Sequence, residues 1–147
     1  MTISFDEEDG DEEVDRHDGL VVSLTISNCL MMRVLIEIGS LANIMLKNAL
    51  ESMGLQEVDI IKKANALYGF RGEPTRTLGE ITLPTYAKGV NLQTRFSVVD
   101  CPSTYNIIMG TPWIHKMEVV PSTYHQTIKF PIKWGVHQEI KGDRKLA

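Results

Sequence analysis

A carboxylate at the end of an apolar run is the first feature of this sequence that could do chemistry. Glu37 follows the apolar residues 34–36 and opens the tetrad Glu-Ile-Gly-Ser. A second apolar run, residues 107–109, ends in Gly110. A carboxylate held in place by a strand can act as a general acid or base. Either segment alone is more typical of a turn than of a catalytic site. The order of the two segments along the chain is therefore a stronger indication of a catalytic site than either segment.

Short strands are predicted to position these segments. Alternating and β-branched residues bounded by glycine, proline and asparagine are typical of strands and hairpins. Residues 67–74 contain two glycines among aromatic residues, and together with the following residues up to 83 they predict a hairpin with a mobile, glycine-hinged tip. The pattern as a whole predicts a small all-β, barrel-like domain of about seven strands. The strands expected outside that hairpin are 20–26 and 31–37, paired through a turn at 27–29, followed by 94–99, 105–110 and 127–130.

One segment predicts a helix. Residues 43–53 place their apolar side chains on one face, with Asn43 as the expected N-cap and Gly54 just past the end. Residues 111–117 are expected to begin a helical turn.

Composition and charge divide the chain into a domain and two ends. The 147 residues are 43% hydrophobic and 23% charged, which fits one globular domain. Residues 1–18 hold nine acidic residues and one basic residue. Such a block cannot offset the entropy of its own ordering. We therefore expect an acidic disordered leader at 1–17, a domain at 18–142 and a tail at 143–147, the two ends resembling cut ends of a longer polyprotein.

Several functional classes are disfavoured by what the sequence lacks. The basic residues form no dense cluster with aromatic residues, so nucleic acid is not an expected partner. No apolar run is long enough to span a membrane, and no targeting signal is visible, so a cytoplasmic location is expected. Cys29 and Cys101 form no CxxC pair, so the sequence predicts neither a zinc ribbon nor a disulfide scaffold. His115, His125 and His137 lack ligand spacing, so no metal site is expected.

The segments, in this order, resemble those of the retropepsin-like aspartic proteases. The resemblance is closest to the protease region of plant long-terminal-repeat retrotransposon polyproteins of the Gypsy type, and it covers residues 17–142. Its most specific parts are 17–22, 34–44, 67–70, 98–102, 105–115 and 121–131.

The resemblance implies a fold and a mechanism. It implies a small closed β-barrel of the retropepsin type with one short helix, in which each chain forms one lobe of a homodimer. The two lobes each supply one aspartate, the pair shares a proton and activates water, and no cofactor takes part. The substrate would be a peptide or polyprotein. The implied site residues are Glu37, Gly39 and Ser40 in the catalytic loop, Tyr68, Gly69, Phe70 and Gly72 in a flap over the substrate, and Ile107, Ile108 and Gly110 in a supporting strand.

Two substitutions separate this chain from the family pattern. Glu37 stands where the family has aspartate, and Ile38 stands where it has threonine or serine, or asparagine in many plant elements. The extra methylene moves the carboxyl oxygens by about 1.5 Å, and a misplacement of about 1 Å can cost on the order of a hundredfold in rate. We therefore expect an impaired aspartic endopeptidase. The alternative is a catalytically dead dimerisation or binding module, or a decayed retrotransposon remnant.

Overall fold

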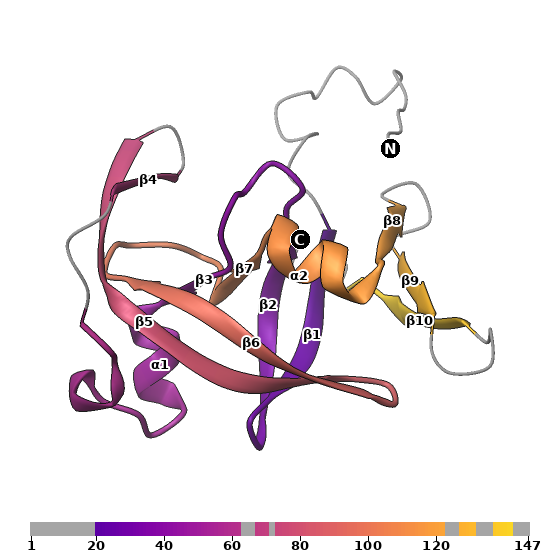
Figure 1. The fold of residues 1–147 in the computed structure, drawn as a ribbon, viewed down its shortest axis with the longest axis horizontal. Coiled ribbons are helices and arrows are strands. Elements are labelled where there is room, and N and C mark those ends of the chain that lie inside the picture. The colour runs from indigo at the N-terminus through magenta and orange to yellow at the C-terminus, as the bar shows by residue number, and fades with distance from the viewer. Residues whose placement is uncertain (1–19, 63–66, 71–72, 123–126, 132–136, 143–147) are drawn as a thin grey trace.

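The computed structural model describes residues 20–62, 67–70, 73–122, 127–131 and 137–142, which are mostly β-strands (Figure 1). The expected leader, the tail and the flap residue Gly72 lie outside these described residues. The elements are β1 (Leu20–Ile26), β2 (Cys29–Ile36), β3 (Ile44–Leu46), α1 (Lys47–Ser52), a 3-10 turn η2 (Glu57–Asp59), β4 (Leu67–Phe70), β5 (Glu73–Ala87), β6 (Val90–Val99), β7 (Ile107–Met109), α2 (Thr111–Met117), β8 (Val120–Ser122), β9 (Thr127–Pro131) and β10 (His137–Lys141).

The main sheet closes on itself to form a barrel. Its strand order is β1-β2-β7-β3-β6-β5-β4, and β1 also pairs with β5 through Thr25 with Tyr86 and Ile26 with Thr85. The β2–β7 and β3–β6 pairs are parallel, and the other pairs of this sheet are antiparallel. Closure leaves the paired strands of the barrel without an open edge. The predicted closed β-barrel is therefore confirmed.

Local sequence explains most of the hairpins. β1 and β2 pair through a tight turn in which Ser27 adopts a φ of 56°, as predicted from the turn signal. The β4–β5 hairpin also forms as predicted, but β5 continues beyond the expected end at residue 83. Pro84, which suggested that end, pairs in register with Gln93, and its carbonyl oxygen accepts the Ser27 N–H at 2.8 Å. The long β5–β6 hairpin was therefore missed.

The predicted helix is correct at its end and wrong at its beginning. Residues 44–46 form β3, which pairs with β6 and β7, so α1 begins at Lys47 and Asn43 is not its N-cap. Tertiary pairing overrides the helical pattern there. At the other end, Gly54 has a φ of 83°. Its N–H donates to the backbone carbonyl of Glu51, and the Leu55 N–H donates to the backbone carbonyl of Leu50. This is the expected glycine C-cap. The helical turn expected at 111–117 is the helix α2.

The core fills the barrel and extends under α2. Its largest fully buried side chains include Trp113 of α2, Phe96 of β6 and Phe130 of β9. The small sheet of β10, β9 and β8 contributes to this core through Ile128 and Phe130. Figure 1 shows this sheet beside α2, and Trp113 of α2 belongs to the same buried cluster as Ile128 and Phe130.

An ion-pair cluster joins α1 to its neighbours. The Lys47 ammonium lies 3.3 Å from Glu57 and 3.9 Å from Asp100, and Lys62 lies 3.6 Å from Glu57. The hydrogen bond and the charge of Lys47 lower the pKa of Glu57 below its ordinary 4.5. The same contact with Glu57 raises the pKa of Lys47 above 10.5. Both shifts stabilise the charged pair, although solvent exposure keeps its contribution small.

This cluster predicts that the stability difference between wild type and a variant without Lys47 depends on pH. A lowered carboxyl pKa stabilises the fold above about pH 4.5 and this contribution is lost as the pH falls through the folded-state pKa. Lys47→Met should therefore slightly lower the melting temperature at pH 7, and the difference from wild type should shrink at pH 3. Thermal melts followed by circular dichroism measure both values. Lys129→Met, at an exposed position of β9, is the control and should show no such pH-dependent difference.

Candidate functional site

Glu37 begins a tight loop between β2 and β3. Its N–H donates to the carbonyl of Met109 at 2.9 Å, which extends the pairing of β2 with β7 by one residue. Its own carbonyl accepts the Ser40 N–H at 3.2 Å, which closes the turn. A Cβ atom built on Gly39 would lie 3.7 Å from the Glu37 Oε2 atom. The carboxyl group is therefore folded back over its own loop and is only partly buried.

Thr111, the first residue of α2, binds this loop through two hydrogen bonds. Its N–H donates to the Ser40 carbonyl at 2.9 Å, and its hydroxyl donates to the Ile38 carbonyl at 2.8 Å. The Ser40 hydroxyl donates to the carbonyl of Ala42 at 2.7 Å. The carbonyl groups of residues 38, 40 and 42 thus have fixed partners. Their positions are set by the protein rather than by solvent, as a preorganised site requires.

The side chain of Asn43 fastens the end of the loop to two strands. It is 5% exposed, and its Oδ1 accepts the Gly110 N–H at 2.9 Å. Its Nδ2 donates to the Arg95 carbonyl of β6 at 3.3 Å, while its own carbonyl accepts the Ser97 N–H at 2.8 Å. Asn43 therefore connects the loop, β6 and the end of β7.

Gly110 lies where two segments of backbone approach each other closely. A Cβ atom at this position would lie 2.6 Å from the Ser40 carbonyl oxygen and would also overlap the carbonyl oxygen of Ala42. These are backbone atoms that cannot move aside without displacing the loop. The glycine that ends the second apolar run is therefore required by packing against the Glu37 loop.

The structure brings two of the three predicted groups of site residues together. Ile107 and Ile108 are buried in β7, which lies between β2 and β3 beside the Glu37 loop. The predicted flap residues Tyr68, Gly69 and Phe70 form β4, which pairs with the beginning of β5. In Figure 1 this hairpin and the Glu37 loop both project from the upper side of the barrel. The roles of all these residues in catalysis remain predictions.

Asn43 and Thr111 are structural members of the site that sequence reasoning missed. Asn43 was interpreted as a helix cap, although it is a polar residue that immediately precedes the apolar run 44–46. That context was the available signal for a buried amide. Thr111 follows Gly110 directly, but nothing in the sequence pairs it with Ile38, because the two residues are far apart in the chain.

Two large apolar side chains of the loop face solvent. Ile38 is 54% exposed and Leu41 is 85% exposed, whereas the flanking Ile36 and Ile44 are buried. Exposed apolar side chains next to a carboxylate mark a candidate interaction surface.

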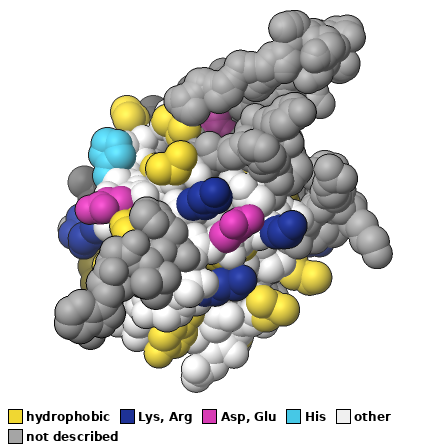
Figure 2. Space-filling model, turned by 90° about the vertical axis from the view of Figure 1, so that its right-hand side faces the viewer, with side chains coloured by type: hydrophobic (Ala, Val, Ile, Leu, Met, Phe, Trp, Pro, Cys, Tyr) yellow, Lys and Arg dark blue, Asp and Glu magenta, His cyan; other side chains and the backbone are white. Residues whose placement is uncertain are grey.

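Basic, acidic and apolar side chains are mixed on one face of the described residues (Figure 2). On the face shown in Figure 2, lysine and arginine side chains are interspersed with acidic and apolar ones and form no continuous basic surface. Among the described residues, no group of three histidine, cysteine or acidic side chains is arranged to hold a metal ion. Within the same residues, no helix has the length and apolar character needed to cross a membrane. The expectations about metals and nucleic acid remain predictions.

Two solved structures have folds similar to that of this chain. The chain is similar to the retroviral protease-like domain of Ddi1 from Leishmania major, with a TM-score of 0.66 and 16% identity over 86% of this chain and 94% of that one. It is also similar to the EIAV protease complexed with the inhibitor HBY-793, with a TM-score of 0.53 and 13% identity over 79% of this chain and 95% of that one. No protein-family model and no curated protein matches it. The predicted retropepsin-type fold is thus confirmed.

Removing the Asn43 amide should loosen the loop. Asn43→Ala leaves the Gly110 N–H and the Arg95 carbonyl without their partner, and a buried unsatisfied group costs about 1–3 kcal/mol. Urea unfolding should show a loss of stability in this range. Asn48→Ala, at an exposed position of α1, is the control and should stay within about 0.5 kcal/mol of wild type. Equal losses in the two variants would contradict the role assigned to Asn43.

Gly110→Ala should destabilise the fold more than Gly39→Ala. The Cβ at 110 meets the backbone of the loop, and such overpacking costs about 1–3 kcal/mol. The Cβ at 39 makes only an ordinary van der Waals contact with Glu37. Thermal or urea unfolding of the two variants measures the difference, and equal stabilities would show that the loop can move away from β7.

Proposed function

We propose that this chain, which has the fold of a retropepsin lobe, is a retroelement-derived aspartic-peptidase-like domain of the Gypsy type whose activity is impaired. Its ancestral reaction is hydrolysis of a peptide bond in a peptide or polyprotein. The observation that carries the proposal is the position of Glu37. Its carboxylate lies at the end of β2, on a loop fixed by Met109 of β7 and by Thr111 of α2.

In this proposal two copies of the chain supply one Glu37 each. Two carboxyl groups brought close together cannot both ionise, so their pKa values separate and the pair holds one proton. The charged member takes a proton from a water molecule, whose oxygen then attacks the carbonyl carbon of the substrate. The protonated member stabilises the developing oxyanion, and the peptide nitrogen leaves with a proton. The hairpin of β4 and β5 covers the substrate and limits the access of water.

Two features of the loop support impairment. The glutamate side chain is one methylene longer than aspartate, and in a symmetric pair both carboxyl groups move toward the place of the attacking water. Ile38 offers no side-chain hydrogen bond beside the pair, and its own backbone carbonyl is already bound by the Thr111 hydroxyl. Both features are therefore expected to disturb the position of the attacking water.

The exposed apolar residues of the loop support a homodimer. Ile38 and Leu41 expose 54% and 85% of their surface in the single chain. Contact with a second copy would remove this apolar surface from water, which stabilises association by roughly 25 cal/mol per Å². Sedimentation at micromolar concentration tests the dimer, and a purely monomeric protein would contradict this part of the proposal.

A binding module without catalysis is the second candidate function. It is favoured by Ile38, because an apolar residue at this position strengthens contact between two copies without assisting a carboxylate. In this case the fold and the dimer persist, and peptides bind in the cleft without being cut.

Restoring the family residues distinguishes the two functions. Wild type should cleave a mixed peptide pool weakly between about pH 4 and 6, in a pepstatin-sensitive manner. Glu37→Ala should abolish this cleavage. Glu37→Asp, alone or with Ile38→Thr, should raise the rate on the order of a hundredfold. The reason is that the aspartate side chain is one methylene shorter and returns the carboxyl oxygens to the distance from the backbone that the family pattern has.

Glu51→Asp is the matched control, since it makes the same change at an exposed position of α1 and should leave the rate unaltered. Silence in wild type with activity in Glu37→Asp would favour the binding module. Silence in every variant, including the double variant, would contradict the peptidase proposal itself.

A further inference from the structure

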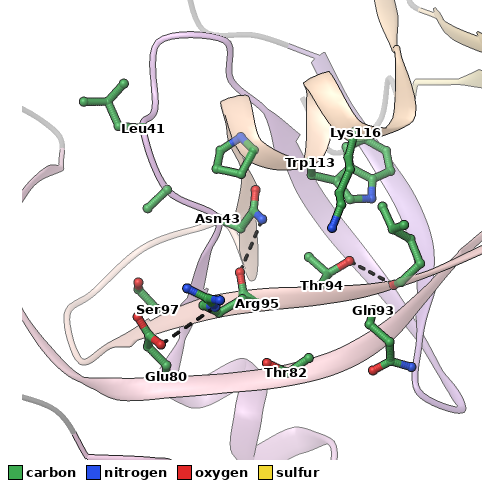
Figure 3. A pocket seen from close by; sticks show the side chains of 13 residues that line it. Leu41, Asn43, Glu80, Thr82, Gln93, Thr94, Arg95, Ser97, Trp113 and Lys116 are labelled. Atoms are coloured by element: carbon green, nitrogen blue, oxygen red, sulfur yellow. Dashed lines mark hydrogen bonds and ion pairs between the residues drawn. The ribbon is translucent and has the colours of Figure 1, made fainter.

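A pocket lies behind the Glu37 loop, and Glu37 does not line it. The pocket encloses about 400 Å³ between the end of that loop, strands β5 and β6, and helix α2 (Figure 3). Leu41 and Asn43 line it from the loop, Thr94 and Arg95 from β6, and Trp113 and Lys116 from α2. Glu37 therefore lies outside this pocket, and Leu41 is shared between the pocket and the surface proposed for the dimer.

The indole of Trp113 places an unsatisfied donor just behind the wall of this pocket. The side chain is 1% exposed, and its Nε1 atom is itself buried and has no hydrogen-bond partner. An indole N–H can only donate, and buried donors in proteins nearly always have an acceptor. Figure 3 shows the indole nitrogen on the ring edge that faces Thr94 and the Lys116 ammonium. The pocket thus lacks an acceptor at a defined point.

The charges of the pocket favour an anionic acceptor. Arg95 is already paired with the Glu80 carboxylate at 3.9 Å. Lys116 is exposed and forms no ion pair within the described part of the chain. It follows Trp113 by three residues, so the two side chains are neighbours on the surface of α2. One uncommitted cation and one uncommitted N–H therefore lie side by side.

We propose that this pocket binds a carboxylate group carried on a small apolar body. One carboxylate oxygen accepts the Trp113 N–H, the group pairs with the Lys116 ammonium, and the apolar body lies against Pro112. Lys116 lies in front of the indole in Figure 3, so its flexible side chain shifts as the ligand enters. The carboxylate is either that of a free carboxylic acid or that of an acidic side chain in a peptide.

The resonance of the Trp113 indole N–H reports binding directly. The chain has two tryptophans, so Trp134→Phe leaves Trp113 as the single indole signal in a nitrogen–proton correlation spectrum. Isovalerate is the free-acid probe, with isovaleramide as its uncharged control. The peptide probe is Ac-Leu-Asp-Leu-NH2, with Ac-Leu-Asn-Leu-NH2 as its control. We expect a saturable downfield shift with a carboxylate probe and none with its amide partner, and the tighter of the two carboxylates identifies the source.

Variants test the role of the cation. Lys116→Gln should weaken carboxylate binding by up to about fivefold, as expected for a solvent-exposed ion pair. Lys129→Gln, on β9, should leave the affinity unchanged. An indole resonance that does not move with either carboxylate, or that moves equally with the amides, would overturn the proposal. Because the measurement uses no peptidase activity, it stands independently of the function proposed for Glu37.

Discussion

The buried amide of Asn43 is the interaction on which the arrangement of the site depends. It accepts from the Gly110 N–H and donates to the Arg95 carbonyl, so one side chain fixes the distance between the loop, β7 and β6. A hydrogen bond is stronger inside the protein than in water, and an unpaired polar group there is costly. The loop is therefore restricted to conformations that keep both partners. The absence of a side chain at Gly110 is what allows the backbones to approach so closely.

The same constraint connects the two sides of the loop. The backbone of the loop is bound by Thr111 and Asn43, whereas the Ile38 side chain is 54% exposed and Glu37 is half-buried. The carbonyl groups of residues 38, 40 and 42 have partners within the protein, and none of these bonds uses the side chains at 37 and 38. The two side chains that differ from the retropepsin pattern therefore take no part in these backbone contacts. The scaffold can persist unchanged while the chemistry of the loop is altered.

Sequence alone predicted those parts of the fold that local signals determine. The β1–β2 hairpin follows from alternation and a turn signal, and the end of α1 follows from Gly54. Glu37 and Gly110 were singled out because each ends an apolar run, and the structure places their segments side by side, while their catalytic roles remain predictions. The strand β3 was missed because its three residues are held by pairing with β6 and β7, and no local preference reveals that pairing. The hydrogen bonds of the Asn43 amide were missed for the same reason, because its partners come from distant segments.

The parallel pairing of β2 with β7 has a consequence for the order of folding. The β5–β6 hairpin joins residues that are close in sequence, so it can form early at little entropic cost. The hydrogen bonds that tie the Glu37 loop to Gly110 and Thr111 instead join residues 67 and 73 positions apart. Closing so long a segment costs more entropy and slows the formation of those contacts. We therefore expect the loop to form after the β5–β6 hairpin, together with the equally long-range pairing of β2 with β7, so that errors in its sequence affect a late step of folding.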